Sequence, residues 1–341
     1  MTFNISLITG DGVGPDLADS TVVILNALQD STNLSFNTTL LPAGDLALSK
    51  YGSALPQDTL DAIQNSDACI KAPVGESAKD VIVHLRQKLN LYANIRPAKS
   101  YSGMPSLFPN VDMVIVRENT EDLYTGAEFD IDDDSAIAMR IITYAASKRI
   151  AQYAYSLASG RRNKVLCVHK SNVLKKTDGI FIRACKDVSE TFPDIPFEQM
   201  YVDACAMNLI RNPESFDVIV TTNMFGDILS DESSQVVGGL GMAPAANIGD
   251  NFALFEPVHG AAFDIAEDHI VNPDSIILSI KMMLEWLGSK HDDLTSIKAA
   301  KLLEDNLLET IRSGVSTPDI GGGATTSEFT EAVASRIRSG K

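Results

Sequence analysis

The sequence is poor in basic residues and in cysteine. Its 28 lysines and arginines stand against 45 aspartates and glutamates, which gives a formal charge of −17 at pH 7. This balance argues against a nucleic acid or an anionic membrane as partner, because a basic surface is missing. The four cysteines (Cys69, Cys167, Cys185 and Cys205) are widely scattered and lack the spacing of a metal site. We interpret them as packing residues in a reducing cytoplasm.

Long apolar runs and a secretion signal are also missing. No stretch approaches the roughly 20 apolar residues that a membrane-spanning helix needs. Residues 1–7 lead directly into a glycine turn and do not resemble a signal sequence. We therefore expect a soluble, cytoplasmic protein. Apolar residues occupy 45% of the 341 positions, which is enough for one large domain or two ordinary ones.

Segments typical of strands and of helices alternate along the chain. Short apolar or β-branched runs predict strands at residues 5–8, 34–41, 68–71, 111–116, 164–168, 218–220 and 253–257. Amphipathic patterns predict helices at residues 17–28, 55–64, 79–88, 137–158, 274–287, 294–312 and 327–337, and the acidic residues 130–134 predict an exposed loop. This alternation predicts an α/β fold with a largely parallel sheet. Without a long linker, a second domain would have to be inserted within the first.

The clearest chemical signal lies in residues 216–232. A predicted buried strand precedes a helix that would present Asp227 and Asp231 on one face, because residues four apart are neighbours on a helix. Two carboxylates without a nearby Cys or His favour Mg²⁺ or Mn²⁺ over zinc. A solvated acidic face is the alternative interpretation. Apolar neighbours favour the ion site, because two carboxylates in apolar surroundings would repel each other without a cation.

Three arginines, Arg86, Arg96 and Arg117, stand near the ends of apolar elements. A guanidinium group binds a carboxylate through two parallel hydrogen bonds, so three of them suggest a di- or tricarboxylate substrate. Any one of them alone would more often form a surface salt bridge. With the aspartate pair, Tyr124 and Lys170, they form a set typical of a metal-dependent enzyme that acts on an acid.

Six motifs follow one another along the chain: residues 10–15 (GDGVGP), 92–97 (YANIRP), 117–124 (RENTEDLY), 168–172 (VHKSN), 226–231 (GDILSD) and 256–260 (EPVHG). The first lacks the Gly-x-Gly-x-x-Gly spacing of a Rossmann dinucleotide site. In this order the motifs resemble the isocitrate/isopropylmalate dehydrogenase family, the β-decarboxylating hydroxyacid dehydrogenases. The resemblance extends over nearly the whole chain, to residues 321–326 (GGGATT).

The resemblance implies an architecture of two α/β domains that share a continuous mixed sheet. Residues 1–92 and 239–341 would form the first, cofactor-binding domain. Residues 93–238 would form an inserted second domain that carries a dimer interface. We therefore expect a homodimer, or a tetramer, whose active sites are shared between chains. A monomer should then be inactive.

The resemblance also implies how the site works. Aspartates matching Asp227 and Asp231, with one matching Asp203 from the partner subunit, would hold Mg²⁺ or Mn²⁺, and Asp203 and Asp227 would also contact the substrate. Lys170 would cross the interface and act as the general base on the C2 hydroxyl, and hydride would pass to the nicotinamide. The metal would stabilise the enolate formed as CO₂ leaves, and Tyr124 would protonate it.

In this family the dinucleotide lies against a loop and not against a Rossmann fingerprint. The matching residues here are Glu256, His259, Gly260, Ala261, Asp264 and Ile265, with Asn272 near the adenine and Asn172 as a further candidate. Asp264 can accept hydrogen bonds from the ribose hydroxyls and would repel a 2′-phosphate. NADP-using relatives tend to carry Lys-Tyr at this point, so we expect NAD⁺. Phe263 replaces the proline that is common beside it.

Substrate choice is expected to lie in the helix before Arg86. Isocitrate dehydrogenases of this family tend to carry Ser-x-Asn, with the serine and the asparagine at the positions of Asp80 and Ile82. Homoisocitrate dehydrogenases tend to carry a basic residue at the position of Val83. Ile82 and Val83 instead offer an apolar wall, which would favour an isopropyl group by roughly 1–2 kcal/mol. An unpartnered carboxylate buried there would cost several kcal/mol. Core packing of both residues is the alternative interpretation, and Lys79 weakens ours, because some bacterial isopropylmalate enzymes have glutamate there.

The expected reaction is therefore the NAD-dependent oxidative decarboxylation of (2R,3S)-3-isopropylmalate to 4-methyl-2-oxopentanoate and CO₂, in leucine biosynthesis. A homoisocitrate or isocitrate dehydrogenase of the same family is the alternative. A non-catalytic regulatory subunit is disfavoured, because the chain retains Tyr124, Lys170 and the three aspartates. A metal- or anion-binding protein without redox activity would produce no NADH with any of these acids.

Asp264 generates the first testable prediction. The purified protein should show a higher kcat/KM with NAD⁺ than with NADP⁺, because the carboxylate at this position repels the 2′-phosphate. Steady-state kinetics with both cofactors and one saturating substrate measure the ratio. A preference for NADP⁺ would contradict the assignment of Asp264.

Overall fold

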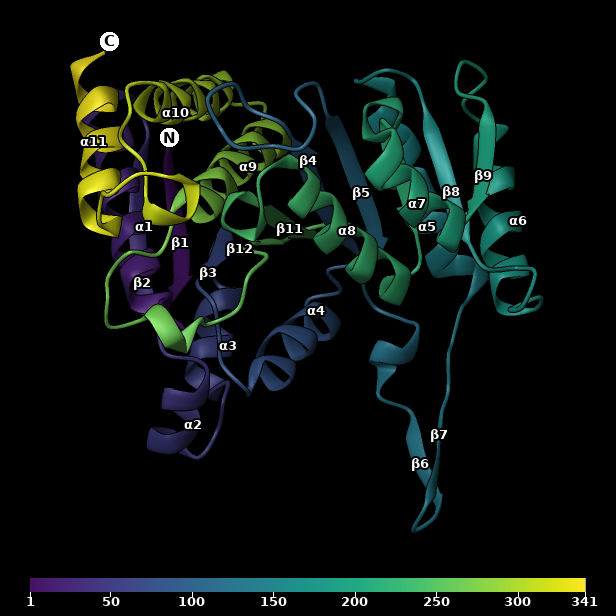
Figure 1. The fold of residues 1–341 in the computed structure, drawn as a ribbon. Coiled ribbons are helices and arrows are strands. Elements are labelled where there is room, and N and C mark those ends of the chain that lie inside the picture. Colours follow the sequence, from purple (N-terminus) through teal and green to yellow (C-terminus); the bar gives the residue numbers. More distant parts are fainter. Residues whose placement is uncertain (341) are drawn as a thin grey trace.

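The computed structural model describes residues 1–340, which build a ten-stranded sheet with helices on both faces (Figure 1). The strand order is β2-β1-β3-β12-β11-β4-β5-β10-β8-β9. The strands are β1 (Thr2–Ile8), β2 (Ser35–Leu41), β3 (Ala68–Lys71), β4 (Ala93–Lys99), β5 (Asp112–Glu118), β8 (Val165–His169), β9 (Phe197–Tyr201), β10 (Val218–Thr221), β11 (Pro244–Ile248) and β12 (Ala253–Pro257). The α/β class predicted from the sequence is confirmed.

The sheet is mixed. Strands β2, β1, β3 and β12 pair in parallel, as do β5, β10, β8 and β9. Between these two groups, β11 is antiparallel to both β12 and β4, and β4 is antiparallel to β5. The sequence pattern did not predict β11, because Pro244 and two alanines open it and only Ile248 is β-branched.

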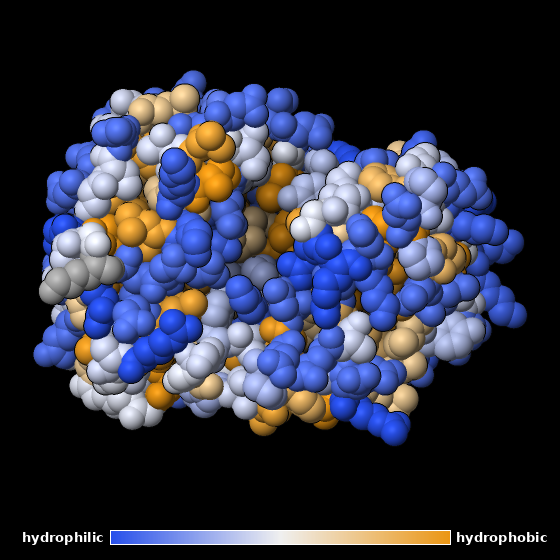
Figure 2. Space-filling view, turned by 90° about the horizontal axis from the view of Figure 1, so that it is seen from above, coloured by the Kyte–Doolittle hydropathy of each residue, from blue (hydrophilic) through white to orange (hydrophobic). Residues whose placement is uncertain are grey.

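Helices cover both faces of the sheet. They are α1 (Gly14–Ser31), α2 (Asp45–Tyr51), α3 (Gln57–Gln64), α4 (His84–Lys88), α5 (Tyr144–Ser159), α6 (Thr177–Ser189), α7 (Val202–Arg211), α8 (Asn223–Val237), α9 (Asp274–His291), α10 (Leu294–Arg312) and α11 (Thr326–Ser339). Within residues 1–340 none of them is both long and apolar enough to span a membrane. The face seen in Figure 2 is mainly hydrophilic, with apolar residues in scattered groups.

Alternate residues of a strand enter different cores. In β5, Val114 and Val116 belong to the largest apolar cluster, which α1, α5, α6, α9, α10 and α11 share. Met113 and Ile115 belong to a second cluster on the opposite face, beneath α7 and α8. A third cluster lies beneath α3 and α4. All four cysteines are buried and free, as predicted.

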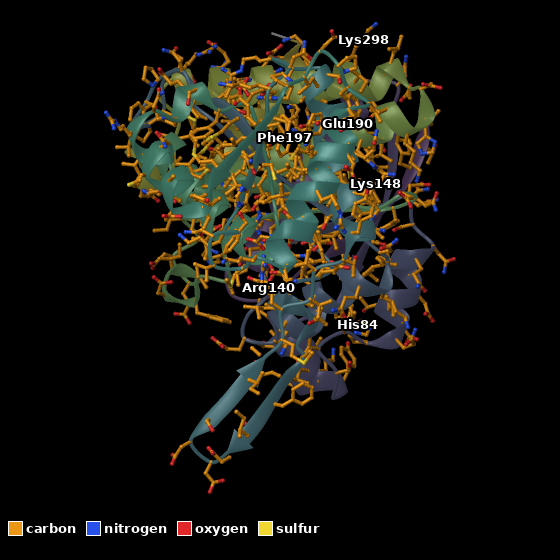
Figure 3. All side chains as sticks on the ribbon, turned by 90° about the vertical axis from the view of Figure 1, so that its right-hand side faces the viewer. His84, Arg140, Lys148, Glu190, Phe197 and Lys298 are labelled. Atoms are coloured by element: carbon orange, nitrogen blue, oxygen red, sulfur yellow. The ribbon has the colours of Figure 1, made fainter. Side chains whose placement is uncertain are left out.

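Two expectations about residues 130–158 are wrong. Residues 130–134 are exposed, as expected, but they belong to a hairpin of β6 (Glu128–Asp132) and β7 (Ser135–Ala138) and not to a loop, and the hairpin projects from the body (Figures 1 and 3). Helix α5 begins at Tyr144 and not at residue 137, because the Thr143 side chain accepts a hydrogen bond from the Ala146 amide and caps the helix there. In the sequence, the apolar residues at 137, 139, 141 and 142 resemble the apolar face of a helix. In the structure the first three are exposed in or next to the hairpin, and residue 142 is buried at its base.

The N-terminal glycine turn serves close backbone packing. Gly10 and Gly12 have φ values of +68° and +56°. A Cβ atom would lie 1.9 Å from the Pro73 carbonyl oxygen at the first position and 2.1 Å from that of Ala261 at the second. Between them, the Asp11 carboxylate accepts hydrogen bonds from the first two amides of α2 and from the amide of residue 75. The turn thus holds α2 and the loop near residue 261 together.

Helix α2 in turn positions the helical segment predicted at residues 79–88. The Asp45 carboxylate accepts hydrogen bonds from the amides of Glu76 and Ser77, at 3.0 and 2.8 Å, and from the Ser77 hydroxyl at 2.6 Å. The segment follows as a π-helical turn, η1 (Lys79–Val83), that continues into α4. The Asp11 carboxylate therefore links the N-terminal glycine turn to α2, and the Asp45 carboxylate links α2 to the segment that carries Arg86.

Candidate active site

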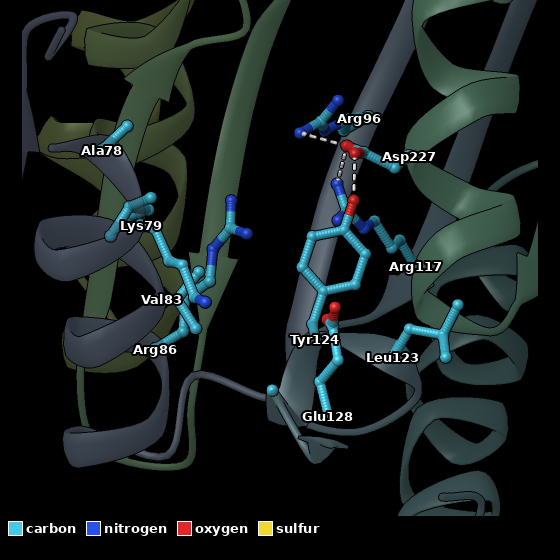
Figure 4. A pocket seen from close by; sticks show the side chains of 12 residues that line it. Ala78, Lys79, Val83, Arg86, Arg96, Arg117, Leu123, Tyr124, Glu128 and Asp227 are labelled. Carbon is cyan, nitrogen blue, oxygen red and sulfur yellow. Dashed lines mark hydrogen bonds and ion pairs between the residues drawn. The ribbon is translucent and has the colours of Figure 1, made fainter. Parts of the chain in front are cut away.

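A cavity of about 460 Å³ lies between the η1–α4 segment and the elements β4, β5 and α8 (Figure 4). It brings together residues that are up to 149 positions apart in the chain, from Ala78 to Asp227. Predicted site residues in its lining are Ile82, Val83, Arg86, Arg96, Arg117, Tyr124 and Asp227, and Lys79, Leu123 and Glu128 also line it. One wall is helical and presents Ile82 and Val83 beside Lys79 and Arg86, whereas the opposite wall carries Arg96, Arg117 and Asp227 (Figure 4).

Asp227 and Asp231 share one face of α8, and both contact Arg96. The guanidinium group lies 3.5 Å from an Asp227 oxygen and 3.1 Å from an Asp231 oxygen. Arg117 forms an ion pair with Asp227, and the Tyr124 hydroxyl donates a hydrogen bond to the second Asp227 oxygen. The aspartate pair and the arginines thus form one cluster.

These contacts set the protonation states of the cluster. Burial raises the pKa of Asp227, but the charges of Arg117 and Arg96 outweigh it and hold that pKa below the ordinary value. Burial also raises the pKa of Tyr124, and the hydrogen bond to the ionised Asp227 raises it further. The pKa of Arg117 falls to about 10 through burial and the charge of Arg96. At neutral pH the aspartate and arginine are therefore charged and the phenol keeps its proton.

Arg117 has capacity for a further anion. Its side chain is 1% exposed, yet its Nη2 atom has no hydrogen-bond partner among residues 1–340. Its Nε atom donates to the Asn223 side chain at 2.8 Å, and Nη1 contacts Asp227. A buried donor without a partner costs free energy unless a ligand satisfies it. The cavity is thus prepared for an acceptor such as a carboxylate.

Sequence reasoning missed a buried polar network beside the arginines. The Asn247 side chain accepts hydrogen bonds from Arg86 and Asn94, both at 2.9 Å, and donates one to Glu256 at 2.8 Å. Glu256 also pairs with Arg86 at 3.2 Å and with Lys71 at 3.0 Å. Burial opposes ionisation of Glu256, but the charges of Lys71 and Arg86 lower its pKa to about 2. Isolated polar residues within buried strands were the signal that could have revealed this network.

Lys170 and Asp203 lie together but outside the cavity. The Lys170 ammonium is 2.6 Å from an Asp203 oxygen, and their side chains are 26% and 63% exposed. Lys170 follows β8, and Asp203 stands in the first turn of α7. Within one chain, the two predicted catalytic residues Tyr124 and Lys170 are therefore not in the same cavity.

Comparison with known proteins identifies the family of the chain. The family described as isocitrate/isopropylmalate dehydrogenase matches residues 4–333. The chain belongs to this family. The 3-isopropylmalate dehydrogenase of Saccharolobus solfataricus is 51% identical over 325 residues, which cover 95% of this chain and 96% of that protein.

Two further members of the isocitrate/isopropylmalate dehydrogenase family extend the comparison. An isocitrate/homoisocitrate dehydrogenase of Thermus thermophilus is 43% identical over 99% of this chain and 100% of its own length. The crystal structure of isocitrate dehydrogenase from Methylococcus capsulatus superposes with a TM-score of 0.91 at 41% identity, covering 98% of this chain and 99% of that one. The family resemblance inferred from the six motifs is confirmed.

A second cavity, of about 310 Å³, contains part of the cofactor set expected for this family. His259, Ile265 and Asn272 line it, together with residues such as Asp319, which accepts a hydrogen bond from Asn272 at 3.0 Å. The Nε2 atom of His259 is buried and has no partner in the described chain. Burial lowers the pKa of this histidine, so the ring is neutral at pH 7.

The other residues expected to bind the cofactor are distributed around this cavity or away from it. Gly260 and Asp264 are exposed, and Ala261 is buried against the N-terminal turn. Asn172 is exposed in the turn beside Lys170. The Glu256 carboxylate lies in the polar network of the first cavity. Glu256 stands near the end of β12, so it links the polar network beside Arg86 with the loop that follows this strand.

Gly226 provides a test of the arginine–aspartate cluster. Replacing a helical glycine by alanine usually stabilises a helix by about 1 kcal/mol. At Gly226, however, the new Cβ would lie 2.6 and 2.7 Å from the Arg117 Cγ and Cβ atoms. Arg117 must then move away from Asp227, so we expect Gly226→Ala to lower kcat/KM by about 100-fold.

Gly179 in α6 supplies the matched control. A Cβ atom there meets no heavy atom of residues 1–340 within 4 Å. Gly179→Ala should therefore raise Tm slightly and keep kcat/KM, as measured by thermal unfolding and initial rates of substrate oxidation. Equal activity in the two variants would contradict the role given to the Arg117–Asp227 contact.

Proposed function

We propose that the protein is an NAD-dependent 3-isopropylmalate dehydrogenase, which converts (2R,3S)-3-isopropylmalate to 4-methyl-2-oxopentanoate and CO₂ in leucine biosynthesis. The observation that carries the proposal is that the first cavity sets the apolar side chains Ile82 and Val83 opposite Arg96 and Arg117 (Figure 4). Arg96 and Arg117 supply donors for carboxylates on one side. Ile82 and Val83 lie on the other, where an isopropyl group would be buried without an unpaired charge.

The relatives support the same substrate. The protein from Saccharolobus solfataricus named 3-isopropylmalate dehydrogenase is 51% identical, against 43% for the isocitrate/homoisocitrate dehydrogenase of Thermus thermophilus. One observation favours a homoisocitrate or isocitrate enzyme as second candidate. Lys79 lines the cavity and has no ion pair among residues 1–340, so its ammonium group could receive a third carboxylate.

Asp227 and Asp231 fit a divalent cation as two of its ligands. Oxygen ligands suit Mg²⁺ or Mn²⁺, but among residues 1–340 no group of three His, Cys, Asp or Glu side chains could hold a metal. We assign the third carboxylate to Asp203 of the partner subunit, whose side chain is 63% exposed in one chain. When bound, the cation would polarise the C2 hydroxyl and stabilise the enolate that forms as CO₂ leaves.

Tyr124 and Lys170 have complementary tasks in this proposal. Burial and the Asp227 hydrogen bond raise the pKa of Tyr124, so the phenol retains a proton that it can donate to the enol carbon. The Lys170 ammonium is tied to the exposed Asp203 carboxylate, away from its own cavity. We assign it the role of general base in the neighbouring chain's site.

The second cavity is assigned to NAD⁺, which would accept hydride from C2. Its apolar lining suits an adenine ring, and the unpaired His259 Nε2 and the Asn272 amide offer polar contacts. Asp264 is exposed in the short helix η5 (Phe263–Ile265), where its carboxylate can reach ribose hydroxyls from solvent. The exposed Phe263 stands next to it.

A homodimer with shared sites follows from the same assignment. Apolar side chains are exposed on the hairpin, at Phe129 and Ile131, and on α7 and α8, at Met207, Ile210 and Ile228. These elements all belong to residues 93–238, the segment we propose as the inserted domain. The strand order supports that division, because β4, β5, β10, β8 and β9 occupy one half of the sheet and the strands of residues 1–92 and 239–341 occupy the other.

A substrate comparison tests the assignment directly. The protein should be assayed with 3-isopropylmalate, isocitrate, homoisocitrate and D-malate, each with NAD⁺ and Mg²⁺. We expect 3-isopropylmalate to give the highest kcat/KM, because only its side group suits the wall of Ile82 and Val83. A tenfold or greater advantage for isocitrate, equivalent to about 1.4 kcal/mol, would contradict the proposal.

Mixed dimers test whether sites are shared between chains. Tyr124→Phe and Lys170→Met homodimers should both be nearly inactive. A mixed dimer of the two chains, purified through two different affinity tags, should recover about half of the wild-type kcat, because one of its two symmetric sites is intact. No recovery in the mixed dimer would show that both residues act within one chain.

A further inference from the structure

Arg140 lies where the hairpin joins the body and is not among the residues expected at the site (Figure 3). Its guanidinium group reaches three segments at once. Nε is 2.7 Å from an Asp122 oxygen, Nη1 contacts Asp178 and donates to the Thr177 hydroxyl at 2.9 Å, and Nη2 donates to the Thr222 hydroxyl at 2.8 Å. The side chains of both aspartates are fully buried, and that of Arg140 is 11% exposed.

Through Asp122, Arg140 is linked to the turn that carries Tyr124. Asp122 has a φ of +72°, which a non-glycine residue adopts only when its surroundings hold it there. Its carboxylate caps the turn that carries Tyr124, by accepting the Leu123 amide at 3.0 Å, and also accepts the Met224 amide at the start of α8. Arg140 therefore supports both the turn that aims the Tyr124 hydroxyl and the helix that carries Asp227.

The Asp178 side of the contact leads to Lys170. The second Asp178 oxygen accepts the backbone amide of Lys170 at 2.5 Å. Thr177 and Asp178 form the first turn of α6, so the guanidinium group fixes this turn relative to the end of β8. The Lys170 side chain then extends to the exposed Asp203.

We propose that Arg140 is a positioning residue that couples the two active sites of the dimer. Through Asp122 it orients the proton donor Tyr124 of its own site, and through Asp178 it orients Lys170, the base of the neighbouring site. This inference rests on the proposed function, because it needs Tyr124 and Lys170 to act in different sites. A rigid ion pair at this junction sets the separation between the two residues, and therefore the geometry of proton transfer in both sites.

Variants of Arg140 separate positioning from stability. Arg140→Gln leaves two buried carboxylates without a cation, and we expect kcat to fall by about 100-fold while KM for the substrate changes little. Arg140→Lys keeps one positive charge between the carboxylates, and should recover much of kcat. Asp178→Asn, which keeps an acceptor for the Lys170 amide, serves as a milder variant if Arg140→Gln does not fold, and should lower kcat without raising KM.

Arg161 provides a matched control for the loss of stability. It pairs with the buried Asp217 and with Asp112, both at 2.7 Å, at the opposite ends of β5 and β10 from the cavity. Arg161→Gln should lower Tm, as Arg140→Gln does, but it should keep kcat. Equal losses of kcat in the two variants, or an unchanged kcat in Arg140→Gln, would overturn the inference.

The mixed dimer of Tyr124→Phe and Lys170→Met chains tests the coupling itself. Its intact site takes Tyr124 from one chain and Lys170 from the other, so Arg140→Gln can be placed in either chain. We expect kcat to fall with both placements, because each disturbs one of the two residues. If one placement leaves kcat unchanged, Arg140 supports only one site and the coupling is wrong. If the parent mixed dimer itself shows no recovery, the shared site of the proposed function is wrong, and the coupling with it.

Discussion

The burial of several positive charges in and beside one cavity is the constraint on which the site depends. Four cations (Lys71, Arg86, Arg96 and Arg117) face three carboxylates (Glu256, Asp227 and Asp231). The four cations repel one another strongly, because water is excluded from the space between them. The carboxylates offset much of this repulsion, but a surplus of positive charge and an unpaired guanidinium nitrogen remain. An anionic ligand would neutralise both, which is why we assign the cavity to a carboxylate substrate.

The reversal of strand direction at the centre of the sheet makes this cluster possible. Strand β4 is antiparallel to both neighbours, and its register places Asn94 opposite Asn247 of β11 and Arg117 of β5. Arg96, two residues further along β4, lies on the same face as Asn94. Helix α8 then brings its aspartates against the guanidinium groups of these arginines. Arg96, Arg117 and Asp227 are thus held by elements that each have a buried apolar face.

The ion pairs beyond the carboxyl ends of β5, β10 and β8 have a different task. The Asp122–Arg140–Asp178 cluster meets the cavity lining at Leu123, whose amide donates to Asp122, and it joins the turn of Tyr124, the start of α8 and the start of α6. Removing one member of a buried ion pair destabilises the fold, because the remaining charge is neither paired nor hydrated. Such a cluster therefore specifies one arrangement of the elements around it.

Local sequence determined those features that depend on neighbouring residues. The strands at residues 68–71 and 253–257 and the helix at residues 294–312 lie where periodicity placed them, and the spacing of four placed Asp227 and Asp231 on one helix face. Only the tertiary structure decided that Arg86 meets Glu256, that β11 enters the sheet, and that the hairpin projects outward with its apolar residues exposed. These features rest on pairing between distant segments, which creates the buried environment that gives a polar side chain its partners and its pKa.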